Sequence, residues 1–211
     1  ASFQASKIIV MSKVAVALYG QPRFYRTGFE EIHKNIIEPL KRAGYGVDVY
    51  FHTWWHEDDI GMKFTRAPWA QLNENDLTAK PGVLDWLVEH YKPVAHKAES
   101  MSIIKTLEIP SGVEGYDNNN YSVPSCIPIF YTMKQMSELI PDNYHRVIKV
   151  RFDMCFGNIP ILEYLDKSRF LVGGSTQPNS VSDMMSISNY SDFKNSCKVY
   201  DNLSVLSKNV F

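Results

Sequence analysis

The residues best suited to chemistry lie in the segment from Arg146 to Phe156, RVIKVRFDMCF. Three of its first five residues are β-branched, so the segment is expected to begin as a buried strand. The strand ends at the carboxylate of Asp153, with Arg151 two residues earlier. A carboxylate at this end of a strand faces the edge where open α/β sheets bind ligands, and it needs a positive partner. That partner is either Arg151, in a plain ion pair, or a bound metal ion.

A second candidate is the turn Tyr19-Gly20-Gln21-Pro22-Arg23, which follows an apolar run at residues 13–19. In a doubly wound sheet, this position borders the nucleotide site. Gly20 would let the backbone approach a ligand, Tyr19 would lie near a base, and Arg23 would meet a phosphate. An ordinary strand-to-helix turn is the alternative interpretation.

The elements that position these residues follow from the hydrophobic pattern. The opening strand, helix and strand predict a parallel βαβ unit, and therefore an α/β fold with a mixed, mostly parallel sheet flanked by helices. We expect Pro39 to kink the first helix or end it early. The expected strands are residues 13–19, 47–53, 93–98, 146–153, 169–172 and 182–188, and the expected helices are residues 30–43, 83–91, 127–139 and 191–206.

Composition narrows the class of protein. The 211 residues are 45% hydrophobic and fit one domain over residues 1–211, either complete or excised from a longer polypeptide. A net charge of −1 offers no basic excess for nucleic acid, and no apolar run approaches the ~20 residues of a membrane helix. Three cysteines without a CxxC pair predict reduced, buried thiols in the cytosol. The acidic run at residues 57–59 predicts a solvated surface.

Common catalytic motifs are missing from the sequence, which has no Walker loop, GxGxxG, GxSxG or HExxH. His52 and His56 straddle a strand end rather than one helix face, which argues against a zinc site. Asp183 enters the short strand at residues 182–188 and is either a turn residue or a site carboxylate. Lys134, on the helix before the Asp153 strand, faces either the ligand site or solvent, and we expect the ligand site.

Four segments together carry a family resemblance: AVALYGQPRF, DVYFHTWW, YHRVIKVRFDMCF and SVSDMMSIS. Over most of its length the chain resembles glycosyltransferase domains of large DNA viruses of algae, above all N-terminal domains linked to capsid-protein glycans. The resemblance implies a GT-A fold with a UDP-sugar at the strand ends and Mn²⁺, or Mg²⁺, on its diphosphate. Most GT-A enzymes hold the metal with an Asp-x-Asp triplet, whereas this chain has Arg151-Phe152-Asp153. The resemblance therefore leaves Asp153 as the metal ligand and as a catalytic residue, helped by phosphate oxygens and water.

The same resemblance, with strand-end position, assigns the other roles. Asp183 is expected to act as the base for the acceptor hydroxyl or to orient the donor sugar. The residues expected to contact the nucleotide sugar are Tyr19, Gly20, Arg23, His52, Trp54, Lys134 and Arg151.

The resemblance also implies glucose or rhamnose as the donor sugar, a glycan or capsid glycoprotein as the acceptor, and the host cytoplasm as the location. The alternatives are a nucleotidyltransferase, which usually needs clustered acids, and a non-catalytic nucleotide-sugar-binding module. An Asp153 turned into the core, or locked to a guanidinium with no room for a cation, would count against the transferase.

Overall fold

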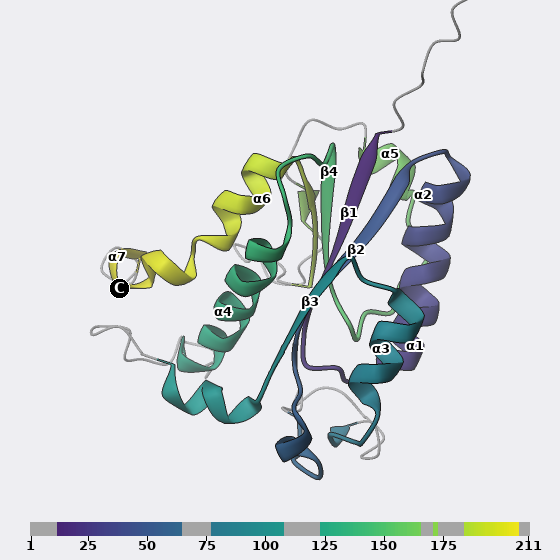
Figure 1. The fold of residues 1–211 in the computed structure, drawn as a ribbon. Helices are drawn as coiled ribbons and strands as arrows, with labels where there is room; N and C mark the ends of the chain where they lie inside the picture. Colours follow the sequence, from purple (N-terminus) through teal and green to yellow (C-terminus); the bar gives the residue numbers. More distant parts are fainter. Residues whose placement is uncertain (1–11, 65–76, 108–122, 166–170, 173–183, 207–211) are drawn as a thin grey trace, which may run out of the picture.

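The computed structural model describes residues 12–64, 77–107, 123–165, 171–172 and 184–206, which form a six-stranded sheet with helices on both faces (Figure 1). The first strand, β1 (Lys13–Gly20), is buried over residues 14–19. A continuous apolar run of this kind is typical of a central strand covered on both sides. The strand predicted at residues 13–19 is therefore confirmed.

The sheet has the order β3-β2-β1-β4-β6-β5. Neighbours among β1 to β4 pair in parallel, whereas β6 is antiparallel to both β4 and β5, which confirms the predicted mixed, mostly parallel sheet. The chain order reverses between β1 and β4, which makes that pair the topological switch point of the sheet. The remaining strands are β2 (Gly46–Trp54), β3 (Ala95–Glu99), β4 (Arg146–Arg151), β5 (Leu171–Val172) and β6 (Met185–Ser188).

One face of the sheet is covered by α1 (Tyr25–Ile32), α2 (Glu38–Arg42) and α3 (Val83–Tyr91), as Figure 1 shows. A wider π-helical segment, η1 (His33–Ile37), joins α1 to α2 and precedes Pro39. The helical run therefore starts five residues before the predicted residue 30 and continues past Pro39. A π-helical segment has i→i+5 backbone hydrogen bonds in place of the i→i+4 bonds of an α-helix. Here it ends two residues before Pro39, whose backbone nitrogen has no hydrogen to donate.

The other face is covered by α4 (Val123–Leu139) and α6 (Tyr190–Cys197) (Figure 1). Helix α4 starts four residues earlier than predicted, so Pro128 lies inside it. The helix predicted at residues 191–206 is divided into α6, η5 (Tyr200–Asn202) and α7 (Leu203–Leu206). In the described part of the chain, no helix has the length and apolar character needed to cross a bilayer.

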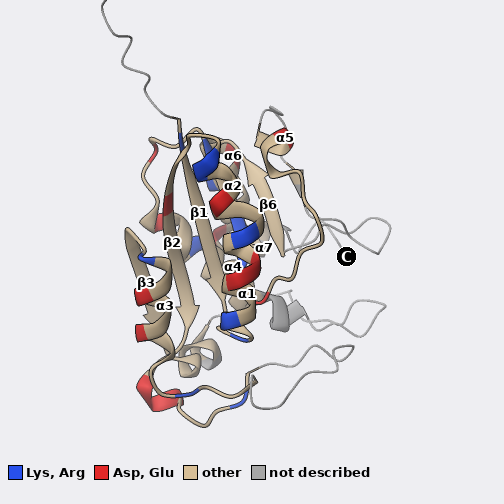
Figure 2. Ribbon diagram, turned by 90° about the vertical axis from the view of Figure 1, so that its right-hand side faces the viewer, with Lys and Arg blue, Asp and Glu red and all other residues tan. Residues whose placement is uncertain are grey.

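Two predictions about exposure hold only in part, because Glu57 and Asp58 are exposed and Cys197 is buried as predicted, whereas Asp59 is buried and Cys155 is exposed. The acidic segment η2 (Glu57–Asp59) lies at the lower edge of the molecule in Figure 2, yet Asp59 is only 1% exposed. The Asp59 carboxylate accepts hydrogen bonds from the hydroxyl of Ser100 at 2.8 Å and from the backbone amide of Met101 at 2.9 Å. It thereby satisfies the first backbone amide of η4 (Met101–Thr106). Cys155, expected to be buried, is exposed.

Candidate functional site

A row of polar and aromatic side chains crosses the carboxyl edge of the four parallel strands. The sheet register pairs Arg151 with Tyr19, Tyr19 with His52, and His52 with Lys97. We call these four residues the edge row. Tyr19, His52 and Arg151 were predicted as site residues from their positions near strand ends and from the family resemblance, and the parallel register brings these strand ends together.

The charged centre of this edge lies at the switch point, where Asp153 binds two guanidinium groups. Arg151 donates from Nε to Oδ1 at 2.9 Å and from Nη2 to Oδ2 at 2.7 Å. Arg23 donates from Nη2 to Oδ2 at 2.5 Å. We call Arg23, Arg151 and Asp153 the charged triad. Their side chains are only 11%, 23% and 14% exposed, so water screens these ion pairs less than it would at an open surface.

The start of α1 places Arg23 beside Asp153 through close backbone packing. A Cβ atom on Gly28 would lie 1.7 Å from the carbonyl oxygen of Phe152, so only glycine permits this approach. Gly20 has a φ of +103°, which lets the chain turn sharply at the end of β1. The two glycines therefore decide where the Arg23 turn lies relative to the end of β4.

Positive charge continues on the α4 side of the switch point. Lys149 is only 4% exposed, and its Nζ atom lies 5.3 Å from the centre of the Tyr19 ring. Tyr19 is itself buried among core residues, at 1% exposure, so its ring covers Lys149. The structure therefore places Tyr19 beneath the site edge, and its predicted contact with a nucleotide base stays a prediction.

The charged triad does not form a ready site for Mn²⁺ or Mg²⁺. Both carboxylate oxygens of Asp153 accept hydrogen bonds from guanidinium groups, and a cation there would face two like charges. Within the described ranges, no group of three Asp, Glu, His or Cys side chains is placed to bind a metal ion. The metal role predicted for Asp153 stays a prediction. Its carboxylate is locked to two guanidinium groups, which is the arrangement expected to count against a transferase that holds its metal at this residue.

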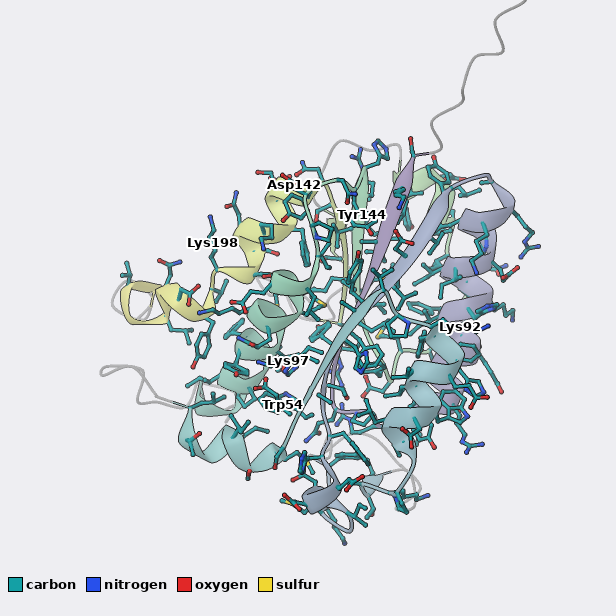
Figure 3. All side chains as sticks on the ribbon, viewed as in Figure 1. Trp54, Lys92, Lys97, Asp142, Tyr144 and Lys198 are labelled. Atoms are coloured by element: carbon teal, nitrogen blue, oxygen red, sulfur yellow. The ribbon has the colours of Figure 1, made fainter. Side chains whose placement is uncertain are left out.

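A second polar cluster lies at the ends of β2 and β3, on the side covered by α4. The Nε2 atom of His52 lies 2.7 Å from the carboxylate of Glu99, which also pairs with Lys97 at 3.0 Å and accepts from the Tyr131 hydroxyl at 3.2 Å. Trp54 stacks on the Tyr131 ring at 5.5 Å, and Figure 3 shows Trp54 and Lys97 on this side of β3. We call His52, Trp54, Lys97, Glu99 and Tyr131 the histidine cluster.

Burial and hydrogen bonding determine the charge states in the histidine cluster. Burial lowers the pKa of His52, so its ring is neutral at pH 7 and donates Nε2–H to Glu99. The hydrogen bond from His52, followed by that from Lys97, lowers the pKa of Glu99 to about 2. The Nδ1 atom of His52 is buried and has no hydrogen-bond partner among the described residues.

The described structure places one predicted site residue, Lys134, in an ion pair away from the charged triad. The ammonium of Lys134 pairs with Asp201 of η5 at 2.5 Å and lies 5.6 Å from the centre of the Tyr200 ring. This places Lys134 against the C-terminal segment. Asp183, the predicted catalytic carboxylate, lies outside the described residues, so its role stays a prediction.

Sequence reasoning missed Glu99, Lys97 and Tyr131. Glu99 is the last residue of β3 and is therefore a carboxylate at the carboxyl end of a parallel strand, like Asp153. The rule that selected Asp153 would have selected Glu99 as well. Tyr131 had no comparable signal, because its contact with Glu99 depends on how α4 packs over the sheet.

A pocket of about 230 Å³ is lined by Phe24, Tyr25, Arg26, Thr27 and Lys80, of which Phe24 directly follows Arg23 in the sequence. It is smaller than the roughly 300–1,000 Å³ of most small-molecule sites. Two of its lining residues, Arg26 and Lys80, are basic, which adds positive charge at the start of α1. We therefore place no whole ligand in this pocket.

Comparisons with known proteins give distant likenesses in structure and none in sequence. No family model matches the chain, and no curated protein matches its sequence. Among solved structures, the chain is similar to mouse xyloside xylosyltransferase 1 in its apo form, a glycosyltransferase, at 9% sequence identity and a TM-score of 0.41. That match covers 93% of this chain and 74% of the mouse chain. A likeness this distant carries no functional argument.

Proposed function

We propose that this protein is a glycosyltransferase that moves a sugar from a nucleotide diphosphate, a UDP-sugar, to a hydroxyl acceptor. The observation that carries the proposal is the meeting of Arg23 and Arg151 at the switch point of a mostly parallel sheet. Open α/β sheets bind nucleotides at this position, and guanidinium groups match the geometry of phosphate oxygens. The four sequence segments that resemble viral glycosyltransferases point to the same class.

The chemistry suits this arrangement. When the bond between the sugar and the diphosphate breaks, negative charge develops on the departing diphosphate. Fixed positive groups beside it stabilise that charge without needing to reorganise during the reaction. Arg23 and Arg151 are oriented by their hydrogen bonds to Asp153, so they are held in place before a ligand arrives. Under this proposal, Asp183 takes the proton of the acceptor hydroxyl or orients the donor sugar.

The finer parts of the proposal come from the sequence resemblance. We propose glucose or rhamnose as the sugar and a glycan or capsid glycoprotein of a large algal virus as the acceptor, with the host cytoplasm as the location. His52 and Trp54 would border the sugar or the base at the end of β2. A divalent cation, when bound, would supply further positive charge to the diphosphate. Because the charged triad does not fit such an ion, no step of the proposed sugar transfer depends on a divalent cation.

A thermal-shift experiment tests the ligand class. UDP, GDP, CMP and ATP would each be added with and without Mn²⁺, because ligands that bind only the native state raise its apparent stability. The proposal expects stabilisation by UDP. Stabilisation by ATP and not by UDP would favour a nucleotidyltransferase.

A second measurement tests turnover. Release of free sugar from UDP-glucose or UDP-rhamnose would be followed in the native protein and in Asp183→Asn. The proposal expects release above background that falls in the variant. Release at background in both proteins, together with UDP binding, would instead identify a non-catalytic nucleotide-sugar-binding module.

A further inference from the structure

We infer that Asp59 is a positioning residue of the proposed donor site. Its buried carboxylate holds the start of η4, and η4 in turn supports residues 19–23, which we call the β1 turn. The inference rests on the proposed function, because the β1 turn contains three of the residues expected to contact the nucleotide sugar. It deepens that function by naming a residue that acts on the site through others.

Asp59 lies in an unusual environment for a carboxylate. It is 1% exposed, whereas Glu57 and Asp58, its neighbours in the acidic run, are exposed. Within the described part of the chain it forms no ion pair, and its carboxylate is compensated by neutral donors. A carboxylate removed from water is costly unless such bonds are made. The bonds of Asp59 therefore decide where the neighbouring backbone lies.

The two oxygens of this carboxylate join the segment after β2 to the segment after β3. Oδ1 accepts from the Ser100 hydroxyl at 2.8 Å, and Oδ2 accepts from the Met101 amide at 2.9 Å. Asp59 ends η2, which follows β2, whereas Ser100 and Met101 come directly after β3. Hydrogen bonds to a charged carboxylate are stronger than those between neutral groups. The carboxylate thus fixes the beginning of η4 at the carboxyl edge of the sheet.

Met101 connects η4 to the β1 turn. It is 6% exposed, and its sulfur accepts a hydrogen bond from the Gln21 side chain at 3.5 Å. Gln21 lies between Gly20 and Pro22, at the centre of the β1 turn. A second contact comes from β2, where the Thr53 hydroxyl donates to the Gly20 carbonyl at 3.1 Å. The β1 turn is therefore held from β2 and from η4, and the position of η4 depends on Asp59.

The conformation of the β1 turn explains why such support matters. Gly20 has a φ of +103°, and glycine has access to many other backbone conformations. Contacts from neighbouring segments are needed to select one of them. A site whose groups are held in place before the ligand arrives loses less freedom on binding. Removing the support should therefore weaken donor binding more than it slows the chemical step.

The test measures UDP binding by calorimetric titration of the whole protein, well below its unfolding midpoint. The variants are Asp59→Ala, Asp59→Asn and Met101→Leu. In Asp59→Asn the amide oxygen can still accept from the Met101 amide while its nitrogen donates to Ser100, so the geometry is kept without the charge. The matched controls are Asp58→Ala and Asp58→Asn, which remove the same charge from a side chain that is 87% exposed.

The variants should differ in a defined order. We expect Asp59→Ala to weaken UDP binding about tenfold, and Met101→Leu and Asp59→Asn less than about threefold, because Asp59→Ala alone loses both strong hydrogen bonds. The Asp58 controls should bind UDP as the native protein does. Because Asp59 acts through Met101, the double variant Asp59→Ala with Met101→Leu should bind UDP no more weakly than Asp59→Ala. In sugar release, Asp59→Ala should raise KM more than it lowers kcat.

Hydrogen exchange followed by mass spectrometry tests the positioning without a ligand. The peptide that carries the β1 turn should exchange faster in Asp59→Ala than in the native protein, because local opening becomes easier when a segment loses its contacts. The same peptide should exchange at the native rate in Asp58→Ala.

The other outcomes separate the inference from the proposed function. Native-like UDP binding and exchange in Asp59→Ala would overturn the inference and leave the glycosyltransferase proposal standing. Equal weakening in Asp59→Asn and Asp59→Ala would overturn it too, because the charge and not the position would then matter, and so would additive losses in the double variant. Absence of UDP binding by the native protein would overturn the proposed function and, with it, the role of Asp59 in donor binding. If Asp59→Ala fails to fold, Met101→Leu, a change of similar volume, decides, and native exchange of the β1 turn there would overturn the inference.

Discussion

Arg23 and Asp153 are 130 residues apart in the chain, yet Nη2 of the arginine lies 2.5 Å from Oδ2 of the carboxylate. This contact ties the turn after β1 to the end of β4, the two segments that flank the switch point of the sheet. The ion pair is therefore a structural link and, in our proposal, the frame of the diphosphate site.

Replacing the carboxylate tests the structural part of this link. Asp153→Asn keeps the shape of the side chain and removes the charge that three guanidinium hydrogen bonds share. We expect the free energy of unfolding to fall by about 2 kcal/mol, the usual size for hydrogen bonds to charged groups. Urea unfolding of the native protein and of the variant measures this difference. An unchanged unfolding midpoint would mean that the triad contributes nothing to stability.

A double-mutant cycle shows whether Arg23 and Asp153 act together. The variants Arg23→Gln, Asp153→Asn and the combination of both would be compared by urea unfolding. Because the two side chains are in direct contact, we expect a coupling free energy of about 1 kcal/mol or more. The pair Lys13–Asp48, whose lysine is 51% exposed, serves as a control and should couple more weakly. Equal coupling in the two pairs would contradict the special position of the triad.

The packing of α1 on the end of β4 predicts a strong effect at Gly28. In Gly28→Ala the new Cβ atom would overlap the Phe152 carbonyl oxygen, 1.7 Å away, so the helix has to move off the strand end. We expect a loss of about 3 kcal/mol in the free energy of unfolding, in the range of severe steric substitutions. Gly157→Ala is the control, because a Cβ there meets no atom within 4 Å. Similar stability of the two variants in thermal unfolding would contradict the predicted close contact.

The pKa of Glu99 predicts how acid affects stability. Its folded value of about 2 lies below the ordinary value of 4.5, chiefly because His52 hydrogen-bonds the carboxylate. The folded state therefore binds fewer protons than the unfolded chain between these values. The resulting stability is fully present above pH 4.5 and is lost as the pH falls from 4.5 towards 2. In Glu99→Gln this part of the pH dependence should disappear, as followed by urea unfolding at several pH values. Glu89→Gln, at an exposed position of α3, should keep the native profile.

The two described cysteines are expected to differ in reactivity. Cys155 is exposed, whereas Cys197 is buried and burial raises its pKa to about 11. Partial desolvation of the thiol, followed by the nearby Glu31 and Asp153 carboxylates, also raises the pKa of Cys155, which slows its reaction below that of a fully solvated thiol. In a Cys126→Ser background, native protein at pH 8 should be labelled by a maleimide at Cys155. Cys197 should be labelled only after unfolding, and peptide mass spectrometry distinguishes the two sites.

The sequence by itself determined the framework that presents the site. The apolar run of β1 and the βαβ pattern around it predicted the parallel core, because burial on two faces leaves a clear local pattern. Strand-end position, with the family resemblance, also selected Arg151, Tyr19 and His52, which the sheet register places side by side, while their contact with a nucleotide sugar stays a prediction. Local patterns carry this information because the side-chain periods of strands and helices repeat over a few residues.

Only the tertiary structure decided how the polar side chains pair. The sequence left the partner of Asp153 open between Arg151 and a metal ion, and the fold adds Arg23 from 130 residues away. It likewise buries Asp59 beneath η4 and brings Glu99 to His52, contacts between residues 42 and 47 positions apart. Such pairings depend on which segments the sheet order and the helix packing bring together. The tertiary structure therefore decides which charges meet, because a charge can be matched by any opposite charge that the fold brings within reach.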